Sequence, residues 1–248
     1  MRVRIIIAVL LACASVPMTG QTTATFSPSA NEVIARMLAR EMQRETAAHG
    51  YTGIRQYDLE NPLFAKRAHL VANVTCDPDG TMHFQIVSKE GWNSGNSSLR
   101  QALETESQIS RPMTRPMTLI NKDNYALQMM GTALLNGRIA YVIEVVPKRQ
   151  ESYLFRGKIW VYAEDSALAR IEGQLAKTPS IWIRTVRFTL EFRKSGEYWF
   201  PWLSTSTSDV RIFGPTNVSI RFLDYSPQSE SAAKHSDLSS LEAYYVQH

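Results

Sequence analysis

The residues best suited to catalysis do not converge in this sequence. Five histidines occur among its 248 residues, and no spacing between them matches a zinc site. In the hairpin predicted by the alternation over residues 70–86, His83 faces Thr75, whereas His69 lies near Lys89. The two imidazoles therefore do not meet. We interpret the histidines as surface residues and expect no metal site.

Two serine motifs resemble catalytic signatures without completing them. Residues 231–234 read Ser-Ala-Ala-Lys, as in penicillin-recognising enzymes, but the partner motifs are missing. Residues 91–95 read Gly-Trp-Asn-Ser-Gly, which places Ser94 one position away from that of a nucleophile elbow. The sequence has no phosphate-cradling loop and no dinucleotide fingerprint. We therefore expect a protein that is not an enzyme and holds no cofactor.

The composition is that of a globular protein with a large core. Apolar residues make up 44% of the chain and charged residues 20%. The formal net charge of +4 falls to +2 when Arg2 and Arg4 are subtracted, and no basic cluster remains. No interior stretch approaches the ~20 apolar residues that a membrane-spanning helix needs. We therefore expect neither a nucleic-acid partner nor a spanning helix in the body of the chain.

Residues 1–20 read as an export signal. Arg2 and Arg4 form a basic start, Ile5–Leu11 is an apolar run, and small or turn-forming residues continue to Gly20. This order of charge, apolar run and small residues is typical of secretory signal peptides. We therefore expect an exported protein.

Cleavage of this signal has two readings. Leu-Leu-Ala-Cys at residues 10–13 resembles a lipoprotein processing box, which would acylate Cys13 and anchor the protein. A cut between Gly20 and Thr25 would release an unanchored protein, and we favour it because the apolar run before Cys13 is short. Without Cys13 the chain keeps only Cys76. It then forms no internal disulfide, and its stability comes from the core.

Two amphipathic helices are predicted. The first begins at a cap formed by Ser29 or Asn31 and carries apolar residues spaced by three and four positions. These residues are Val33, Ile34, Met37, Leu38 and Met42. The second helix covers 97–110 and is ended by Pro112.

The sequence between these helices predicts a hairpin. Leu70, Ala72 and Val74 alternate with polar residues, and the same alternation returns at Phe84 and Ile86 after a turn at residues 78–80. A three-residue loop with Gly80 in the left-handed region pairs Val74 with Phe84. Both apolar sets then lie on one face of the sheet.

The remainder of the chain predicts further strands with short connections. Turns at 136–137 and 195–196 separate alternating apolar runs, and a strand ends near Tyr225 before a Ser-rich stretch. About ten strands result, so neighbours in sequence should be neighbours in an antiparallel meander. The sets Val186-Phe188-Leu190-Phe192 and Val218-Ile220-Phe222 should face inward, toward the first helix.

The apolar face of such a sheet is larger than two helices can cover. Ten strands of about eight residues present a face of roughly 48 by 27 Å. Two helices about 10 Å across cover about 500 of its roughly 1,300 Å². Two outcomes stay open at this point: the sheet closes as a barrel filled by its own side chains, or it stays partly open and holds an apolar ligand.

One stretch of this meander resembles a known superfamily. Tyr153–Val161 is an aromatic-rich strand, Glu164-Asp165 an acidic turn, and residues 169–173 read Ala-Arg-Ile-Glu-Gly. Together with the order of elements, these motifs resemble the lipoprotein-carrier superfamily: LolA-like proteins, RseB-type sensors and mycobacterial lipid carriers. The resemblance covers residues 124–226 well, and the part before them only by order of elements.

The resemblance implies an α+β fold, a half-open antiparallel β-barrel of about ten strands covered by two or more helices. It implies a carrier-like domain over residues 21–228. The Ser-rich composition after the last strand predicts a mobile tail at 229–248. A hydrophobic cavity for acyl chains is expected inside the barrel. Arg55, on the first strand, is the candidate for the arginine that holds the lid shut in the carriers.

The function implied is that of an exported, periplasmic, non-enzymatic binder or carrier of lipid or lipoprotein acyl chains in a bacterial envelope. The alternatives are a sensor of the RseB type, in which the cavity gates contact with an envelope protein, and a membrane-anchored lipoprotein. Peripheral contact with a membrane is compatible with each. The residues expected to line the cavity are Met37, Phe84, Met113, Met117, Met129, Ile159, Ile171, Phe188, Leu190, Ile220 and Phe222.

A tandem Arg-Pro-Met-Thr repeat at residues 111–118 is predicted to cross the surface as irregular chain. In an extended repeat, Met113 and Met117 would project to one side and contact an entering acyl chain, because methionine adapts to variable surfaces. We predict a mobile lid at the cavity mouth. The alternative is a plain connector whose methionines cover the edge of the core.

Overall fold

The structure is a computed structural model that describes residues 28–48, 50–178, 180–181, 183–196, 198–212 and 214–227. The predicted signal at 1–20, the processing box at Cys13 and the predicted tail at 229–248 lie outside the described residues. No helix among the described residues is long and apolar enough to cross a membrane.

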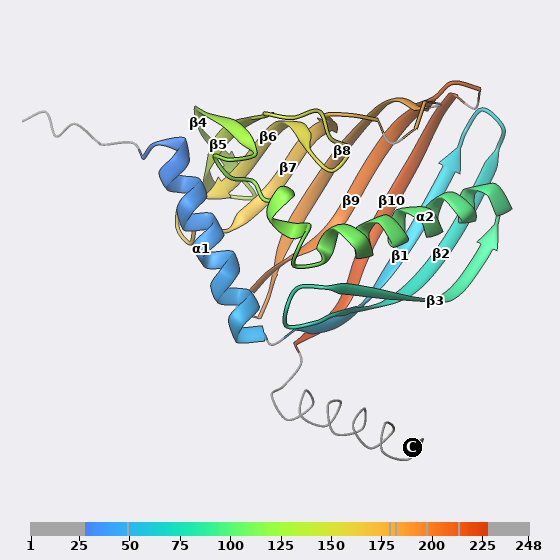
Figure 1. The fold of residues 1–248 in the computed structure, drawn as a ribbon, viewed down its shortest axis with the longest axis horizontal. Coiled ribbons are helices and arrows are strands. Elements are labelled where there is room, and N and C mark those ends of the chain that lie inside the picture. Colours follow the sequence, from blue (N-terminus) through green and yellow to red (C-terminus); the bar gives the residue numbers. More distant parts are fainter. Residues whose placement is uncertain are drawn as a thin grey trace, which may run out of the picture.

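Within the described residues, ten strands form one curved antiparallel sheet, and two α-helices lie on its inner side (Figure 1). The sheet is open, because β3 and β4 form its two edges and do not pair with each other in this part of the chain. This is the half-open α+β barrel predicted from the sequence. The strands are β1 (Tyr51–Asn61), β2 (Lys66–Cys76), β3 (Met82–Gly91), β4 (Tyr125–Leu135), β5 (Arg138–Pro147), β6 (Phe155–Tyr162), β7 (Leu168–Leu175), β8 (Ile183–Ser195), β9 (Tyr198–Val210) and β10 (Gly214–Pro227).

The order of the strands departs from the predicted meander at one point. The sheet runs β3-β2-β1-β10-β9-β8-β7-β6-β5-β4, so the sequence neighbours β3 and β4 lie at opposite edges. In addition, β1 pairs with β10, the last strand along the chain. The expectation that sequence neighbours always pair is therefore wrong between β3 and β4. The physical reason is the connection between them, because residues 92–124 contain a helix and are too long for a hairpin.

The helix α1 (Ala30–Ala48) begins with a reciprocal cap between Ser29 and Glu32. The Ser29 amide donates to Glu32 Oε2 at 2.7 Å, and the Glu32 amide donates to Ser29 Oγ at 3.3 Å. The hydrogen bond from the Ser29 backbone lowers the pKa of Glu32. Of the two predicted caps, Ser29 is therefore the one formed. The apolar residues Val33, Ile34 and Met37 face the sheet and are buried.

The helix α2 (Asn93–Ser110) begins one turn earlier than the sequence indicates. Gly95 lets this first turn approach β2 closely, because a Cβ at this position would lie 2.9 Å from the Cβ of Ala68 on β2. The Asn96 side chain then donates to the Glu90 carbonyl at 2.9 Å and ties the first turn to the end of β3. Leu99 and Leu103 bury the helix against the sheet.

The register of the predicted hairpin is confirmed. Val74 pairs with Phe84, and the Asp77 amide donates to the Thr81 carbonyl at 2.9 Å. Gly80 has a φ of 88°, in the left-handed region that the turn requires. The turn at Asn136 and Gly137 is also formed, with positive φ at both residues.

The core consists mainly of two separate clusters on the inner face, one under each helix. Val33, Ile34 and Met37 of α1 pack on β4 to β7, and Leu99 and Leu103 of α2 pack on β1 and β2. Three of the four residues in the inward set on β8, Phe188, Leu190 and Phe192, join the cluster under α1, as predicted. The inward set on β10 does not, because Val218 and Ile220 join the cluster under α2. The prediction that both sets face α1 is therefore wrong for β10, which lies between β1 and β9 in the half that α2 covers.

Candidate functional site

Nine of the eleven residues predicted to line a cavity lie on the inner side of the molecule, in two groups with different degrees of burial. Met37, Ile159 and Ile171 are fully buried and fill the core under α1. The others keep part of their apolar surface accessible between the helices and the sheet. We call this second group the inner apolar surface; it consists of Phe84, Met129, Phe188, Leu190, Ile220 and Phe222.

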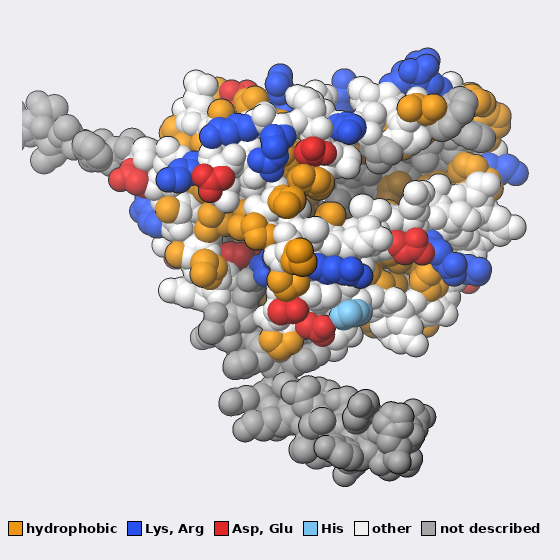
Figure 2. Space-filling model, viewed as in Figure 1, with side chains coloured by type: hydrophobic (Ala, Val, Ile, Leu, Met, Phe, Trp, Pro, Cys, Tyr) orange, Lys and Arg blue, Asp and Glu red, His pale blue; other side chains and the backbone are white. Residues whose placement is uncertain are grey.

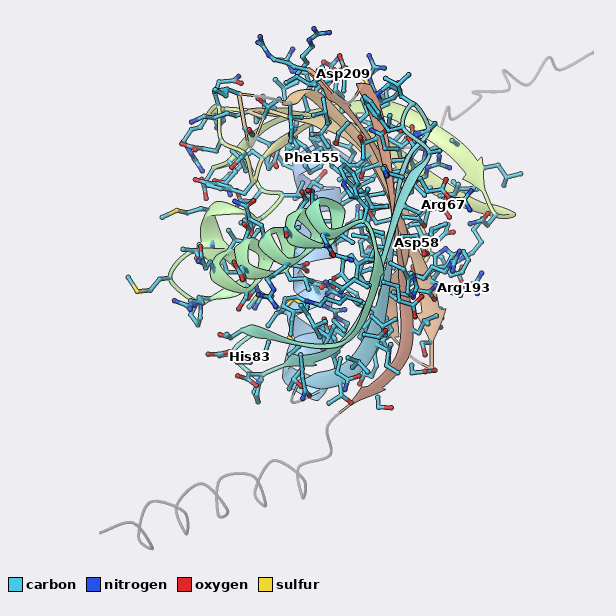
Figure 3. The ribbon with its side chains drawn as sticks, turned by 90° about the vertical axis from the view of Figure 1, so that its right-hand side faces the viewer. Asp58, Arg67, His83, Phe155, Arg193 and Asp209 are labelled. Carbon is cyan, nitrogen blue, oxygen red and sulfur yellow. The ribbon has the colours of Figure 1, made fainter. Side chains whose placement is uncertain are left out.

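The inner apolar surface spans both halves of the sheet. Phe188 is half-buried and meets Phe155 edge-on, with ring centroids 5.5 Å apart. Figure 3 shows Phe155 in the space between helices and sheet, whereas Asp58, Arg67 and Arg193 lie on the outer side. Figure 2 shows the face above α2 hollowed, with hydrophobic side chains visible in the hollow. Apolar side chains are therefore accessible where neither helix covers the sheet.

The remaining two predicted residues lie at the surface. Met113 is 88% exposed, and Met117 is also exposed. The segment is not extended as predicted, because Arg115–Met117 forms a turn of 3₁₀ helix with Pro116 in its first turn. Asn124 fixes this turn by donating from its side chain to the carbonyls of Pro116 and Leu119, each at 2.9 Å. The role of the two methionines as a lid stays a prediction.

A buried charge lies where α2 crosses the sheet. Arg55 is 5% exposed, and its Nη1 donates to Oε1 of Glu106 on α2 at 2.7 Å. The aromatic rings of Phe84 and Phe222 flank the guanidinium at 5.1 and 4.7 Å. Burial alone would lower the pKa of Arg55, but the Glu106 carboxylate outweighs it and the pKa is raised. The resemblance pointed to Arg55, whereas no sequence signal indicated its partner.

Two serines also hold α2 against the sheet. Ser107 Oγ donates to the Met82 carbonyl at 2.7 Å, and the Met82 amide donates to Ser110 Oγ at 2.9 Å. Both backbone groups of one edge-strand residue are thus satisfied by α2. Together with Arg55 and Glu106, these contacts attach the second half of α2 at the start of β3. Sequence analysis missed them, because a serine on a helix usually faces water.

A cavity of about 280 Å³ lies between the ends of the two helices. Its walls include Arg44, Tyr51, Glu106, Arg115 and Phe200. Burial raises the pKa of Tyr51 to about 12, so its hydroxyl stays neutral. This cavity has a mixed polar and apolar lining, and none of the eleven predicted residues contributes to it.

A second cavity, of about 460 Å³, is lined by arginines and aromatic rings. Arg138 lies 4.1 Å above the Tyr162 ring, and its guanidinium contacts Asp165 at 3.2 Å. Burial opposes the charge of Asp165, but hydrogen bonds from Ala167, Arg138 and Trp199 outweigh it and lower the pKa of this carboxyl. The contacts link β5, β9 and the β6–β7 turn. We interpret this cluster as structural.

The two histidines in the described part of the chain, His69 and His83, each contact an aspartate. His83 Nε2 lies 2.8 Å from Asp77, and His69 Nδ1 lies 2.7 Å from Asp58. The two pairs are separate, and both histidines are partly or fully exposed to solvent. Across the described part of the chain, no group of three or more His, Cys, Asp or Glu residues could hold a metal ion. His49, His235 and His248 lie outside the described residues.

Comparison with models of protein families identifies one that matches the chain. Residues 88–226, more than half of the sequence, match the family described as "Family of unknown function (DUF5686)". The chain belongs to this family. The match begins in β3 and includes α2 and all strands from β4 to β10, so it covers most of the sheet. No curated protein matches the chain.

Several solved structures are similar to the chain at low sequence identity. A LolA superfamily protein from Nitrosomonas europaea has 10% identity and a TM-score of 0.48, covering 82% of this chain and 95% of its own. A putative outer membrane lipoprotein-sorting protein domain from Vibrio parahaemolyticus has 13% identity and a TM-score of 0.44, covering 81% and 94%. The lipoprotein LppX from Mycobacterium tuberculosis has 11% identity and a TM-score of 0.28, covering 80% and 97%. Function must therefore rest on the chain's own residues.

Proposed function

We propose that this protein is a non-enzymatic binder or carrier of lipid acyl chains in the cell envelope. The observation that carries the proposal is the inner apolar surface, which the two helices leave partly uncovered. Phe188 and Leu190 lie at the margin of one cluster, and Ile220 at the margin of the other. An acyl chain placed along this surface would shield apolar groups that water now contacts, and burial of such groups is favourable.

The attachment of α2 supports a role for this helix as a movable cover. Its last turns are held by a charged pair and two serine hydrogen bonds, whereas Leu99 and Leu103 pack the middle of the helix against the sheet. Polar contacts of this kind can exchange with water when the helix moves, unlike a fully interdigitated core. Access of an acyl chain to Phe84 and Phe222 would require this movement, because both rings lie directly beside the Arg55 guanidinium.

The cellular part of the proposal rests on residues 1–20, which read as an export signal. We place the exported protein in the periplasm of a bacterial cell, unanchored after cleavage. The charged outer face of the sheet, with Arg187 and Arg193 exposed, is compatible with diffusion between membranes. An anchored form would instead carry a lipid on Cys13, which the mass of the mature protein distinguishes.

Titration with a fluorescent fatty acid tests this function. We expect saturable binding, competition by an unlabelled fatty acid, and no competition by a short-chain carboxylic acid that cannot fill the apolar surface. The absence of saturable binding, with a protein partner recovered from the envelope instead, would contradict the carrier and favour the sensor alternative.

A further inference from the structure

One end of the sheet carries large apolar side chains that are exposed to solvent. Three adjacent connections hold them: the β1–β2 turn, the β7–β8 loop and the β9–β10 turn. Their exposed fractions range from 47% to 79%. We call this set the apolar tip; it consists of Leu63, Phe64, Ile181 and Ile212.

The three connections are neighbours in space, although they are far apart in the sequence. Ile183 pairs with Val210, so the residues just outside this pair, Ile181 and Ile212, lie at the same edge. A Cβ added at Gly214 would lie 3.3 Å from Leu63 Cδ2, which joins the β1–β2 and β9–β10 turns. Both turns lie together at the upper right of Figure 1. The apolar tip is therefore one surface.

The β1–β2 turn is held in a defined conformation. The Phe64 amide donates to Asn61 Oδ1 at 3.0 Å, and the side chain of this asparagine donates to Thr216 Oγ1 at 3.0 Å. Asn61 is buried, and Ala65 has a φ of 47°, a conformation that non-glycine residues rarely adopt. The turn thus holds Leu63 and Phe64 outward at a cost in backbone energy. Such a cost is often found where a segment has a function.

Basic side chains surround the apolar tip. Lys66, Arg67, Lys177, Arg184 and Arg211 are exposed on the same connections and strand ends. Arg67 pairs with Glu60 at 3.1 Å, and Arg184 pairs with Asp209 at 3.4 Å. Lys66, Lys177 and Arg211 have no ion pair among the residues that the structure describes. Figure 2 shows hydrophobic and basic side chains side by side along this edge.

We propose that the apolar tip, with its unpaired basic residues, docks the protein on the surface of an anionic lipid bilayer. Apolar side chains on protruding turns can enter the boundary between headgroups and acyl chains, while lysines and arginines behind them contact the anionic headgroups. A flat protein partner would leave gaps between three separate turns, whereas a fluid bilayer fills them. This inference goes beyond the proposed function, because docking needs no lipid on the inner apolar surface.

Flotation with vesicles of phosphatidylethanolamine and phosphatidylglycerol tests the docking. The tip variant carries Leu63→Ser, Phe64→Ser, Ile181→Ser and Ile212→Ser. Its affinity for these vesicles should fall at least about tenfold, because four apolar side chains no longer enter the bilayer. A matched control carries Met42→Ser, Met130→Ser, Leu134→Ser and Ile139→Ser, which are similarly exposed elsewhere, and it should bind like the wild type.

Variants of the basic residues provide a second, independent test of the docking. Lys66→Ser, Lys177→Ser and Arg211→Ser should each weaken binding to the anionic vesicles about fivefold. Vesicles of phosphatidylcholine alone should bind weakly, and the three variants should not differ from wild type on them. Equal binding by the tip variant and the wild type would overturn the proposal, as would binding of the wild type to no vesicle at all. Fatty-acid titration of the tip variant should remain unchanged, which separates this proposal from the carrier function.

Discussion

At the scale of single residues, Arg55 links the sheet to its cover. The alternation of β1 places this side chain on the inner face, where water is excluded and a charge requires a partner. Glu106 supplies the negative charge that pairs with Arg55, and two aromatic rings pack on either side of the guanidinium. A buried arginine with one carboxylate partner is stable only while that partner stays in place. The position of α2 thus depends on the pair.

Replacement of each partner should therefore have unequal effects. Glu106→Gln leaves a buried guanidinium without a countercharge and should lower the free energy of unfolding by about 2 kcal/mol. Arg55→Met removes the buried charge, fills most of its volume and should cost less, since the remaining carboxylate can reach water. Urea denaturation measures both values. A larger loss for Arg55→Met than for Glu106→Gln would show that the pair does not carry the attachment of α2.

The carboxyl of Asp165 predicts a pH dependence. Its pKa is lowered in the folded protein, so its contribution is present above the unfolded value of about 3.8 and is lost as the pH falls through the folded value. Asp165→Asn should lower the free energy of unfolding by about 1 kcal/mol at neutral pH. The difference from wild type should vanish in acid, below the folded pKa. A difference that persists there in denaturation curves would assign the effect to packing.

At the scale of elements, β8 shows how one strand serves two environments. Its inward residues border the accessible surface, and its outward residues carry charge into solvent. Phe188 lies on the inward side and contacts Phe155 of β6. Neighbouring positions on this strand therefore make matched variants that differ mainly in the face they occupy.

Phe188→Asp should weaken uptake of a fluorescent fatty acid at least about tenfold, because it places a carboxylate on the apolar surface. Stability should also fall, so Phe188→Ala provides a milder variant that keeps the surface apolar. The control is Arg187→Asp, one residue away on the exposed outer face. Unchanged uptake by folded Phe188→Asp, or equal loss in the control, would remove Phe188 from the binding surface.

The segment after α2 carries a further prediction. Met113 and Met117 are exposed and contribute little to the core, so Met113→Ser with Met117→Ser should change the melting temperature by less than about 2 °C. As parts of a lid, the two methionines should slow lipid departure, and the double variant should release a bound fluorescent fatty acid faster. Equal release rates in stopped-flow experiments would make the segment a plain connector.

At the scale of the whole molecule, sequence patterns predicted the contacts between residues that are close together in the sequence. The pairing of Val74 with Phe84 follows from the geometry of the three-residue loop before it. The loop and the pair were both predicted correctly. The pairing of β1 with β10 joins opposite ends of the chain, and no local pattern reports such a contact. The same limit applies to the pair between Arg55 and Glu106, which are 51 positions apart.

The candidate site was predictable to a similar extent. Alternation identified the inward residues, but it could not separate Ile159, which is buried completely in the core, from Phe188, which keeps accessible surface. That difference depends on where the two helices lie over the sheet. The path of α2 is set by Gly95 and by Arg55, and neither residue stands out in an apolar periodicity.

The measurement that tests the central claim most directly is native mass spectrometry of the protein purified from membranes without denaturant. We predict a population heavier than the mature chain by the mass of one lipid, released as the collision energy rises and lost in Phe188→Asp. The same spectrum reports whether the mature chain carries an acyl group on Cys13. A single unliganded mass in every preparation, under conditions that preserve a known lipid carrier with its lipid, would contradict the account.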